Sequence, residues 1–294
     1  MIDSNFQRKR YLTTDFHQDI RPQVISTFTI TLDCMRLVSF MPLLVAVALL
    51  SATMPVQGED AAYWLAQTSS DYQNGSYKLA LQDIDEYLAL NATDPWAWNF
   101  KANLQLKMKK YRDAVDSFDQ IISLNPSDAK AYNDRALILS GALKQDQEAL
   151  DSLDQALRID PKSASSWYNK GMILEKQGDY EVALQAFSEA TTINPSLDEG
   201  WYRQGIVLAK SGRYNESLQS LDQAIAVNSK NADAWSAKGE VLMAQNSGQE
   251  ALAFFEKALS LQPSNKDFQE KKNEALAMLG QEPEKRIEFS EGKQ

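Results

Sequence analysis

The stretch SWYNKGMILEKQGDYEVALQAFSEATTINP, residues 166–195, carries the pattern that decides the fold. Its first half places Gly171 four residues after Trp167, so both side chains lie on one face of a helix. After the turn KQGDY, a second apolar run places Phe187 four residues after Ala183. A proline closes this run, because proline lacks an amide N–H and clashes with the preceding helical turn. The stretch therefore predicts two antiparallel helices whose small side chains allow close approach.

The same pattern returns along the chain at a nearly constant period. Successive aromatic positions are 34, 34, 35, 34 and 34 residues apart, and they are Trp64, Trp98, Tyr132, Trp167, Trp201 and Trp235. Small residues follow four positions after each of them, at Thr68, Ala102, Ala136, Gly171, Gly205 and Gly239. Bulky apolar residues recur in the second half of each unit, at Ile84, Phe118, Leu153, Phe187, Leu221 and Phe255. A period in this range is typical of stacked helix pairs that bury their apolar faces only against their neighbours.

This order of aromatic, small, small, aromatic and proline positions resembles the motif of the tetratricopeptide repeat family, and WYNKG and WSAKG are similar to its prokaryotic branch. The resemblance implies an all-α, right-handed superhelical solenoid. Six repeats cover residues 61–265, as 61–94, 95–128, 129–163, 164–197, 198–231 and 232–265. The third repeat has one extra residue, in SGALKQDQ, which we predict to lengthen the turn between its helices. We expect residues 266–280 to form a capping helix and the charged residues 281–294 to be a disordered tail.

An uncharged segment precedes the repeats. Residues 37–58 contain no charged side chain, Arg36 stands in front of them and Glu59 follows. A basic start, an apolar run and small residues at its end are typical of a secretory signal peptide, here residues 35–58. A retained membrane anchor is the alternative, because the run approaches the roughly 20 residues that a spanning helix needs. Both alternatives predict an extracytoplasmic protein, secreted or membrane-anchored, whose membrane contact is only through residues 37–56.

Residues 1–34 share no pattern with the rest of the chain. Met35 and Arg36, followed by the apolar run, would form a compact signal peptide by themselves. One hypothesis is therefore that translation starts at Met35 and that the upstream residues are mis-assigned. The alternative is that residues 1–34 form a long unstructured extension on the cytoplasmic side.

The formal net charge of −10 is unevenly distributed, with +1 on residues 1–58 and −11 on residues 59–294 (25 basic against 36 acidic side chains). An acidic body lacks the basic surface that phosphate backbones require, so no nucleic-acid partner is expected. The single cysteine, Cys34, and the single histidine, His17, both precede the body. The body therefore has neither a Cys/His ligand set nor a histidine general base, and we expect no metal, no cofactor and no enzymatic activity.

The resemblance also implies that the first helices line a concave groove that binds peptides or protein segments. Positions two before, one after and five after each repeat aromatic would face this groove. The candidate contact residues at these positions are Trp96, Asn99, Asn103, Asn133, Leu137, Tyr168, Met172, Tyr202 and Ile206. Acidic residues lie toward its C-terminal end, at Glu175, Glu199, Asp233 and Glu240. The expected partner is a protein or peptide segment with apolar anchors that is basic at one end.

The two tryptophans of DPWAWNF, residues 94–100, have different expected roles. Trp98 occupies the aromatic column, so we predict that it belongs to the core of the helix pair, where replacement by alanine would cost roughly 3–5 kcal/mol. Trp96 either packs on the preceding repeat or is an exposed anchor for a partner. Tyr168 and Tyr202 are likewise either partner contacts or part of the scaffold.

Together these features predict a non-catalytic scaffold that mediates protein–protein or protein–peptide interaction through its groove. Two alternatives stay open. A cytoplasmic co-chaperone-like adaptor would follow if the apolar segment had no targeting role. A glycan- or small-ligand-binding accessory module would require a deep aromatic pocket in place of an open trough.

Overall fold

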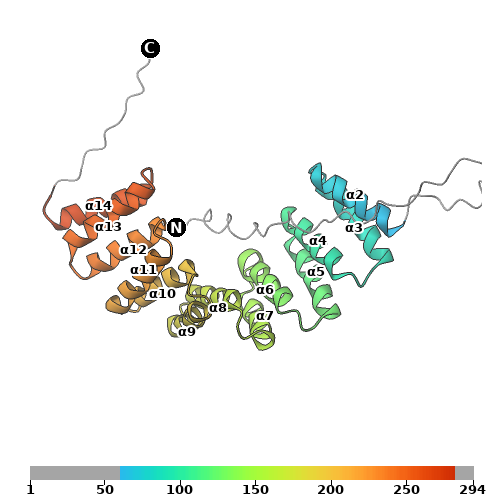
Figure 1. Cartoon of the computed structure of the whole chain (residues 1–294), viewed down its shortest axis with the longest axis horizontal. Coiled ribbons are helices and arrows are strands. Elements are labelled where there is room, and N and C mark those ends of the chain that lie inside the picture. The colour runs from blue at the N-terminus through green and yellow to red at the C-terminus, as the bar shows by residue number, and fades with distance from the viewer. Residues whose placement is uncertain (1–59, 282–294) are drawn as a thin grey trace, which may run out of the picture. The chain divides into compact units, whose positions relative to one another are not determined.

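A computed structural model describes residues 60–281 of the chain (Figure 1). Contacts divide the chain into two units, Met1–Pro55 and Val56–Gln294, and everything described below belongs to the second unit. The predictions for residues 1–58, and for the tail beyond residue 281, lie outside the described residues.

The described part of the chain is all-α. Its helices are α2 (Ala61–Gln73), α3 (Tyr77–Leu90), α4 (Pro95–Lys107), α5 (Tyr111–Leu124), α6 (Ala129–Ile138), α7 (Asp146–Ile159), α8 (Ala164–Gln177), α9 (Tyr180–Ile193), α10 (Asp198–Lys210), α11 (Tyr214–Val227), α12 (Ala232–Ala244), α13 (Gly248–Leu261) and α14 (Lys266–Met278). A short π-helical turn, η1 (Leu139–Leu143), continues α6.

The helices pack as consecutive pairs, from α2 with α3 to α12 with α13, and α14 packs against α13 (Figure 1). In the view of Figure 1, first helices such as α4 and α6 lie on the upper side of the row, and second helices such as α5 and α7 lie on the lower side. Each pair also contacts the next one, as stacked repeats require. The all-α, superhelical repeat fold that the resemblance implied is confirmed.

Close approach within each pair depends on the column of small residues. A Cβ atom added to Gly171 would lie 2.7 Å from the ring of Phe187, and one added to Gly205 would lie 2.7 Å from Leu221. Phe187 and Leu221 are fully buried members of the bulky column. The two columns therefore meet across the helix pair, and the size of one sets how near the other can come.

The turn inside each repeat contains one residue with a left-handed backbone. Glycine occupies this position at Gly75, Gly178 and Gly212, with φ between 73° and 87°. Lys109, Lys144 and Asn246 take the same conformation at the corresponding positions, with φ of 60° to 62°. Because a Cβ atom disfavours this region by roughly 1–2 kcal/mol, the three non-glycine turns are strained relative to the glycine turns.

The extra residue of the third repeat is accommodated differently from the prediction. It does not lengthen the turn, which has two residues here, 144 and 145, as it has in the fourth repeat. Instead η1 widens the end of the first helix, and the N–H of Lys144 donates to the carbonyl of Leu139. A π-helical turn takes up one residue while the hydrogen bonding continues, so Lys144 still reaches the left-handed turn position.

The repeat tryptophans differ from the prediction that placed Trp98 in the core of its own helix pair. Trp98 is only partly buried, and it packs against the apolar clusters of both the first and the second repeat. Indole N–H groups donate to the carbonyl six residues earlier, in the link between repeats, for Trp98 to Ala92 (2.8 Å), Trp167 to Pro161 (3.0 Å), Trp201 to Pro195 (3.0 Å) and Trp235 to Ser229 (3.0 Å). These side chains therefore connect neighbouring repeats.

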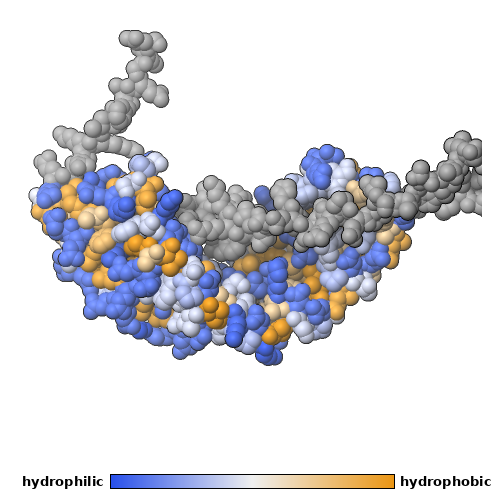
Figure 2. Space-filling model, viewed as in Figure 1, coloured by the Kyte–Doolittle hydropathy of each residue, from blue (hydrophilic) through white to orange (hydrophobic). Residues whose placement is uncertain are grey.

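Figure 2 shows hydrophilic residues over most of the face in view, with separate hydrophobic patches among them. Side chains that contribute large exposed apolar surface include Leu90 (55%), Leu79 (50%) and Trp96 (46%). Of the helices within residues 60–281, none combines the length and the apolarity that crossing a membrane would require.

Candidate functional site

The candidate contact residues all lie on first helices, and we call the surface formed by α2, α4, α6, α8, α10 and α12 the first-helix face. Trp96 lies at the start of α4, where Asp94 caps the helix by accepting from the N–H of Trp96 at 2.9 Å. The indole of Trp96 stacks on Phe100, one turn later in the same helix, with ring centroids 5.4 Å apart. Phe100 in turn meets the edge of Tyr72 in α2 at 5.3 Å. Trp96 is therefore an exposed side chain that stacks on a buried neighbour in its own helix.

The asparagine cluster separates into two parts. Asn99 and Asn103 are partly exposed, and the Nδ2 group of Asn103 donates to the Oδ1 atom (2.8 Å) and the backbone carbonyl (2.9 Å) of Asn99. Asn133 is only 9% exposed. Its Oδ1 atom accepts from Asn169 of the next repeat at 2.8 Å and from Ser166 at 3.3 Å. Asn133 therefore holds α6 to α8, and we do not include it in the proposed contact surface.

A mostly buried cation lies on α10, in the fifth repeat. Arg203 in α10 lies 3.6 Å from Glu175 in α8, and Lys210 approaches the other oxygen of Glu175 at 2.7 Å. Although burial disfavours the charged guanidinium, its interactions with Tyr168, Glu175 and Tyr202 raise the pKa of Arg203. Glu175 is therefore neutralised within the scaffold, and it does not contribute the negative charge that was expected for a partner.

Tyr202, the residue before Arg203 in α10, interacts with carboxylates of its own helix and of α12. Burial, together with the negative charges of Asp233, Glu240 and Glu199, raises the pKa of the Tyr202 hydroxyl. Of these carboxylates, Glu240 pairs with Lys271 of α14 at 2.6 Å. The hydroxyl of Tyr202 is thus neutral and lies in a region of negative potential.

The remaining apolar candidates are partly buried. Met172 and Tyr168 pack against the core cluster around Phe187, and the ring of Tyr168 lies 5.8 Å from that of Phe187. Ile206 packs beside Tyr202 on the cluster around Leu221, and Leu137 is also half-buried. The apolar strip therefore offers a partner the edges of scaffold side chains, whereas Trp96 is 46% exposed. Within residues 60–281, no group of three or more His, Cys, Asp or Glu side chains is placed to hold a metal ion.

Comparison with known families decides what this architecture is. The sequence profile described as tetratricopeptide repeat matches residues 101–164, 147–198 and 202–266. The chain belongs to the tetratricopeptide repeat family. A second profile, described as anaphase-promoting complex, cyclosome, subunit 3, matches residues 44–121. No curated protein sequence matches the chain.

Solved structures of other proteins share the fold. YrrB, described as a TPR protein with an unusual peptide-binding site, is 23% identical with a TM-score of 0.54, over 64% of this chain and 97% of that chain. PilW, described as a widely conserved type IV pilus biogenesis factor, is 19% identical with a TM-score of 0.59, over 71% of this chain and 97% of its own. The pilF protein of Pseudomonas aeruginosa is 16% identical with a TM-score of 0.59, over 73% and 97%. At these identities the similarity concerns the fold alone.

Reasoning from the repeat columns missed Arg203. The columns assign groove-facing roles to fixed positions, and Arg203 lies two residues after its repeat tryptophan, at a position outside them. Its partner, Glu175, lies 28 residues earlier in the sequence, on the first helix of the preceding tetratricopeptide repeat. A search for opposite charges on successive first helices would have indicated this pair, but not its burial.

Proposed function

We propose that this chain is a non-catalytic scaffold that binds a protein segment along its first-helix face. The family supports a role in protein–protein interaction, since tetratricopeptide repeat proteins are generally non-catalytic scaffolds. YrrB, which shares the fold, is described as having a peptide-binding site. The observation that carries the proposal is the exposure of Trp96, a large ring that is 46% exposed yet fixed by stacking on Phe100. Interfaces concentrate their binding energy in such anchors.

The charges of the face favour one orientation of the bound segment. Carboxylates surround Tyr202 toward the C-terminal repeats, whereas the surface near Trp96 is aromatic. A segment with an apolar anchor near Trp96 and basic residues near Asp233 and Glu199 would match both regions. Arg203 lies between them and neutralises Glu175, so the middle of the segment needs no charge of its own.

Binding by a displayed peptide library tests the proposed face. Peptides selected on the full chain should carry an aromatic or aliphatic anchor and Lys or Arg at one end. Trp96→Ala should weaken their binding about tenfold or more, as expected for a hot spot. The matched control is Leu79→Ala, which removes an equally exposed apolar side chain from the second helix α3 and should leave binding unchanged. Equal binding by wild type and Trp96→Ala would contradict the proposal.

A charge variant tests the orientation. Asp233→Asn should weaken binding and reduce its dependence on salt, because one attractive charge is removed. Glu86→Gln removes an exposed carboxylate from the second helix α3 and serves as the control. Unchanged affinity and salt dependence in Asp233→Asn would show that basic residues of the partner do not bind there.

We further propose that the repeats function outside the cytoplasm, secreted or anchored by the apolar segment. The support is the uncharged run of residues 37–58, with Arg36 before it and an acidic body after it. A fusion of residues 1–60 to a reporter that is active only after export tests this. No reporter activity would indicate a cytoplasmic scaffold and would leave the proposed binding face unaffected.

A further inference from the structure

Neighbouring repeats are joined by ion pairs that recur at one position. Each pair joins a carboxylate on a second helix to a cation sixteen residues later, on the first helix that follows. These inter-repeat ion pairs are Asp85–Lys101 (2.8 Å), Asp119–Arg135 (2.7 Å), Asp154–Lys170 (2.6 Å), Asp222–Lys238 and Glu256–Lys272 (3.3 Å). The cationic side chains are mostly buried, with exposed fractions of 10% to 22%. The junction is therefore a repeated binding position for a cation.

At two of these junctions the repeat tryptophan also faces the cation. The ammonium of Lys101 lies 4.8 Å from the ring centroid of Trp98, and that of Lys170 lies 5.6 Å from Trp167. In each case the ring belongs to the residue three positions earlier in the same helix. A carboxylate on one side and an aromatic face on the other both attract a cation.

The junction between α9 and α10 lacks the ion pair. At its two positions, again sixteen residues apart, stand Ser188 and Gln204 instead of an acid and a cation. The aromatic residue is still present, as Trp201. The Oε1 atom of Gln204 is buried, and it has no hydrogen-bond partner among the residues that the structure describes. A buried acceptor without a donor is unfavourable, so this junction is incomplete as it stands.

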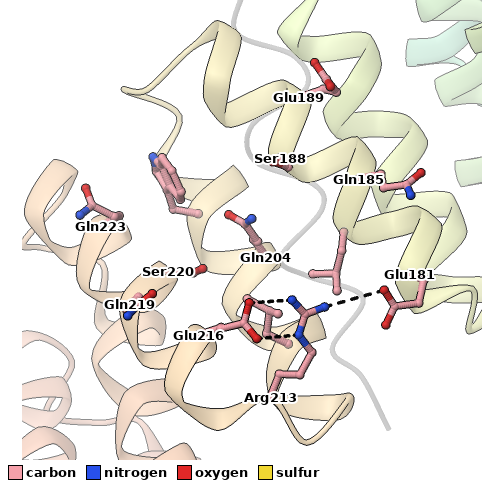
Figure 3. Close-up of a pocket in the computed structure, with 13 residues that line it drawn as sticks. Glu181, Gln185, Ser188, Glu189, Gln204, Arg213, Glu216, Gln219, Ser220 and Gln223 are labelled. Atoms are coloured by element: carbon pink, nitrogen blue, oxygen red, sulfur yellow. Dashed lines mark hydrogen bonds and ion pairs between the residues drawn. The ribbon is translucent and has the colours of Figure 1, made fainter.

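A cleft of about 730 Å³ lies at this junction, between α9, α10 and α11. Figure 3 shows Gln204 pointing into it from α10, with Gln185 and Ser188 on the α9 side and Gln219 and Ser220 on the α11 side. Trp201 also lines the cleft. Ser188 and Gln185 are exposed, so the cleft opens to solvent on the side of the second helices, away from the first-helix face.

The charges of the cleft favour one additional cation. Its lining contains Glu181, Glu189 and Glu216 against the single basic residue Arg213. Arg213 already pairs with Glu216 at 2.6 Å and with Glu181 at 3.7 Å (Figure 3). Glu189, which follows Ser188, has no ion pair within the described part of the chain. One carboxylate of the cleft lining therefore remains for a single positively charged group.

We propose that this cleft binds the ammonium group of a lysine side chain from a partner protein, in place of the cation that the other junctions supply themselves. The ammonium would enter the cleft that Ser188, Glu189 and Gln204 line, and it would face the ring of Trp201. The site is separate from the first-helix face, so it adds a second contact surface on the other side of the solenoid. A lysine fits better than a two-ended polyamine, because Arg213 already satisfies the other two carboxylates.

Nuclear magnetic resonance of the full chain tests the site with a defined probe. N-acetyl-lysine N-methylamide should shift the side-chain amide signals of Gln204 and the indole N–H of Trp201 in a saturable way. The matched control probe is N-acetyl-norleucine N-methylamide, which has the same backbone and lacks the ammonium. Equal shifts with both probes, or none with the lysine probe, would overturn the proposal. Putrescine binding without lysine binding would overturn the protein source of the cation.

Two variants test the position itself. The double variant S188D/Q204K rebuilds the missing ion pair, so the chain's own ammonium fills the cleft. The lysine probe should then bind roughly tenfold or more weakly, as measured from the indole N–H signal of Trp201. The converse variant D154S/K170Q removes the ion pair between α7 and α8. It should create a binding site for the lysine probe there, as measured from the indole N–H signal of Trp167. If that variant does not fold, D85S/K101Q at the α3–α4 junction takes its place, followed at Trp98. Unchanged lysine binding in S188D/Q204K would overturn the assignment.

Discussion

Replacing Gly171 by alanine tests how closely the two helices of a repeat are packed. The added Cβ would lie 2.7 Å from the ring of Phe187, about 1 Å inside the usual carbon–carbon contact. Phe187 is fully buried, so its ring has no open space to enter. Overpacking of this kind costs roughly 1–3 kcal/mol, against a gain of about 0.5–1 kcal/mol for removing a glycine from a helix. We therefore expect a net loss of about 1–2 kcal/mol.

The sign of the change in the free energy of unfolding depends on whether the ring of Phe187 is present. Gly171→Ala should destabilise the wild type in urea unfolding followed by far-UV circular dichroism. In the background Phe187→Ala the clash is absent, and the same change should stabilise by about 0.5–1 kcal/mol. Gly141→Ala is the matched control, since no atom lies within 4 Å of its added Cβ, and it should not destabilise. The same sign for Gly171→Ala in both backgrounds would refute the packing argument.

Two further predictions concern a turn and a tyrosine. Lys109→Gly should raise the free energy of unfolding by about 1 kcal/mol, because Lys109 has a φ of 60°; the neighbouring Lys110→Gly, at a φ of −84°, should not stabilise. Tyr87 donates a hydrogen bond to Asp94 at 2.7 Å, and this bond raises the pKa of Tyr87 to about 12. The stabilisation that the hydrogen bond gives is therefore present below pH 10 and is lost as the pH rises through 12. Spectrophotometric titration of the variant Asp94→Asn, which keeps the helix cap, should show a lower pKa for Tyr87. An unchanged titration would exclude the hydrogen bond as the cause of the raised pKa.

The spacing of residues was sufficient to predict the helices and their pairing. A small residue lies four positions after each aromatic, and a bulky residue follows that small residue by sixteen positions, or by seventeen in the third repeat. These positions describe contacts within a single repeat. Such contacts depend on helix geometry and on one short turn, so they can be calculated from sequence positions. The third repeat shows the limit, because one extra residue can enter a turn or a helix, and only the hydrogen bond to Leu139 shows that it entered the helix.

The candidate site was less predictable for a physical reason. Whether a side chain on a first helix is available to a partner depends on what the next repeat places beside it. Asn133 was expected to contact a ligand, but Asn169 of the next repeat occupies its carbonyl. Glu175 was expected to attract a basic partner, but Arg203 and Lys210 neutralise it. These contacts form across repeats, where the relative position of two helices is needed to the precision of a hydrogen bond.

The sequence by itself thus determined the family, the all-α repeat fold and the acidic character of the body, because period and composition are properties of the chain alone. The tertiary structure decided that Trp98 joins repeats, that Arg203 is mostly buried beside tyrosines, and that the cleft beside Gln204 is open. The replacement of an acid and a cation by Ser188 and Gln204 is visible in the sequence. Its meaning required the structure, because an absent ion pair can be recognised only where five equivalent positions show the pair formed.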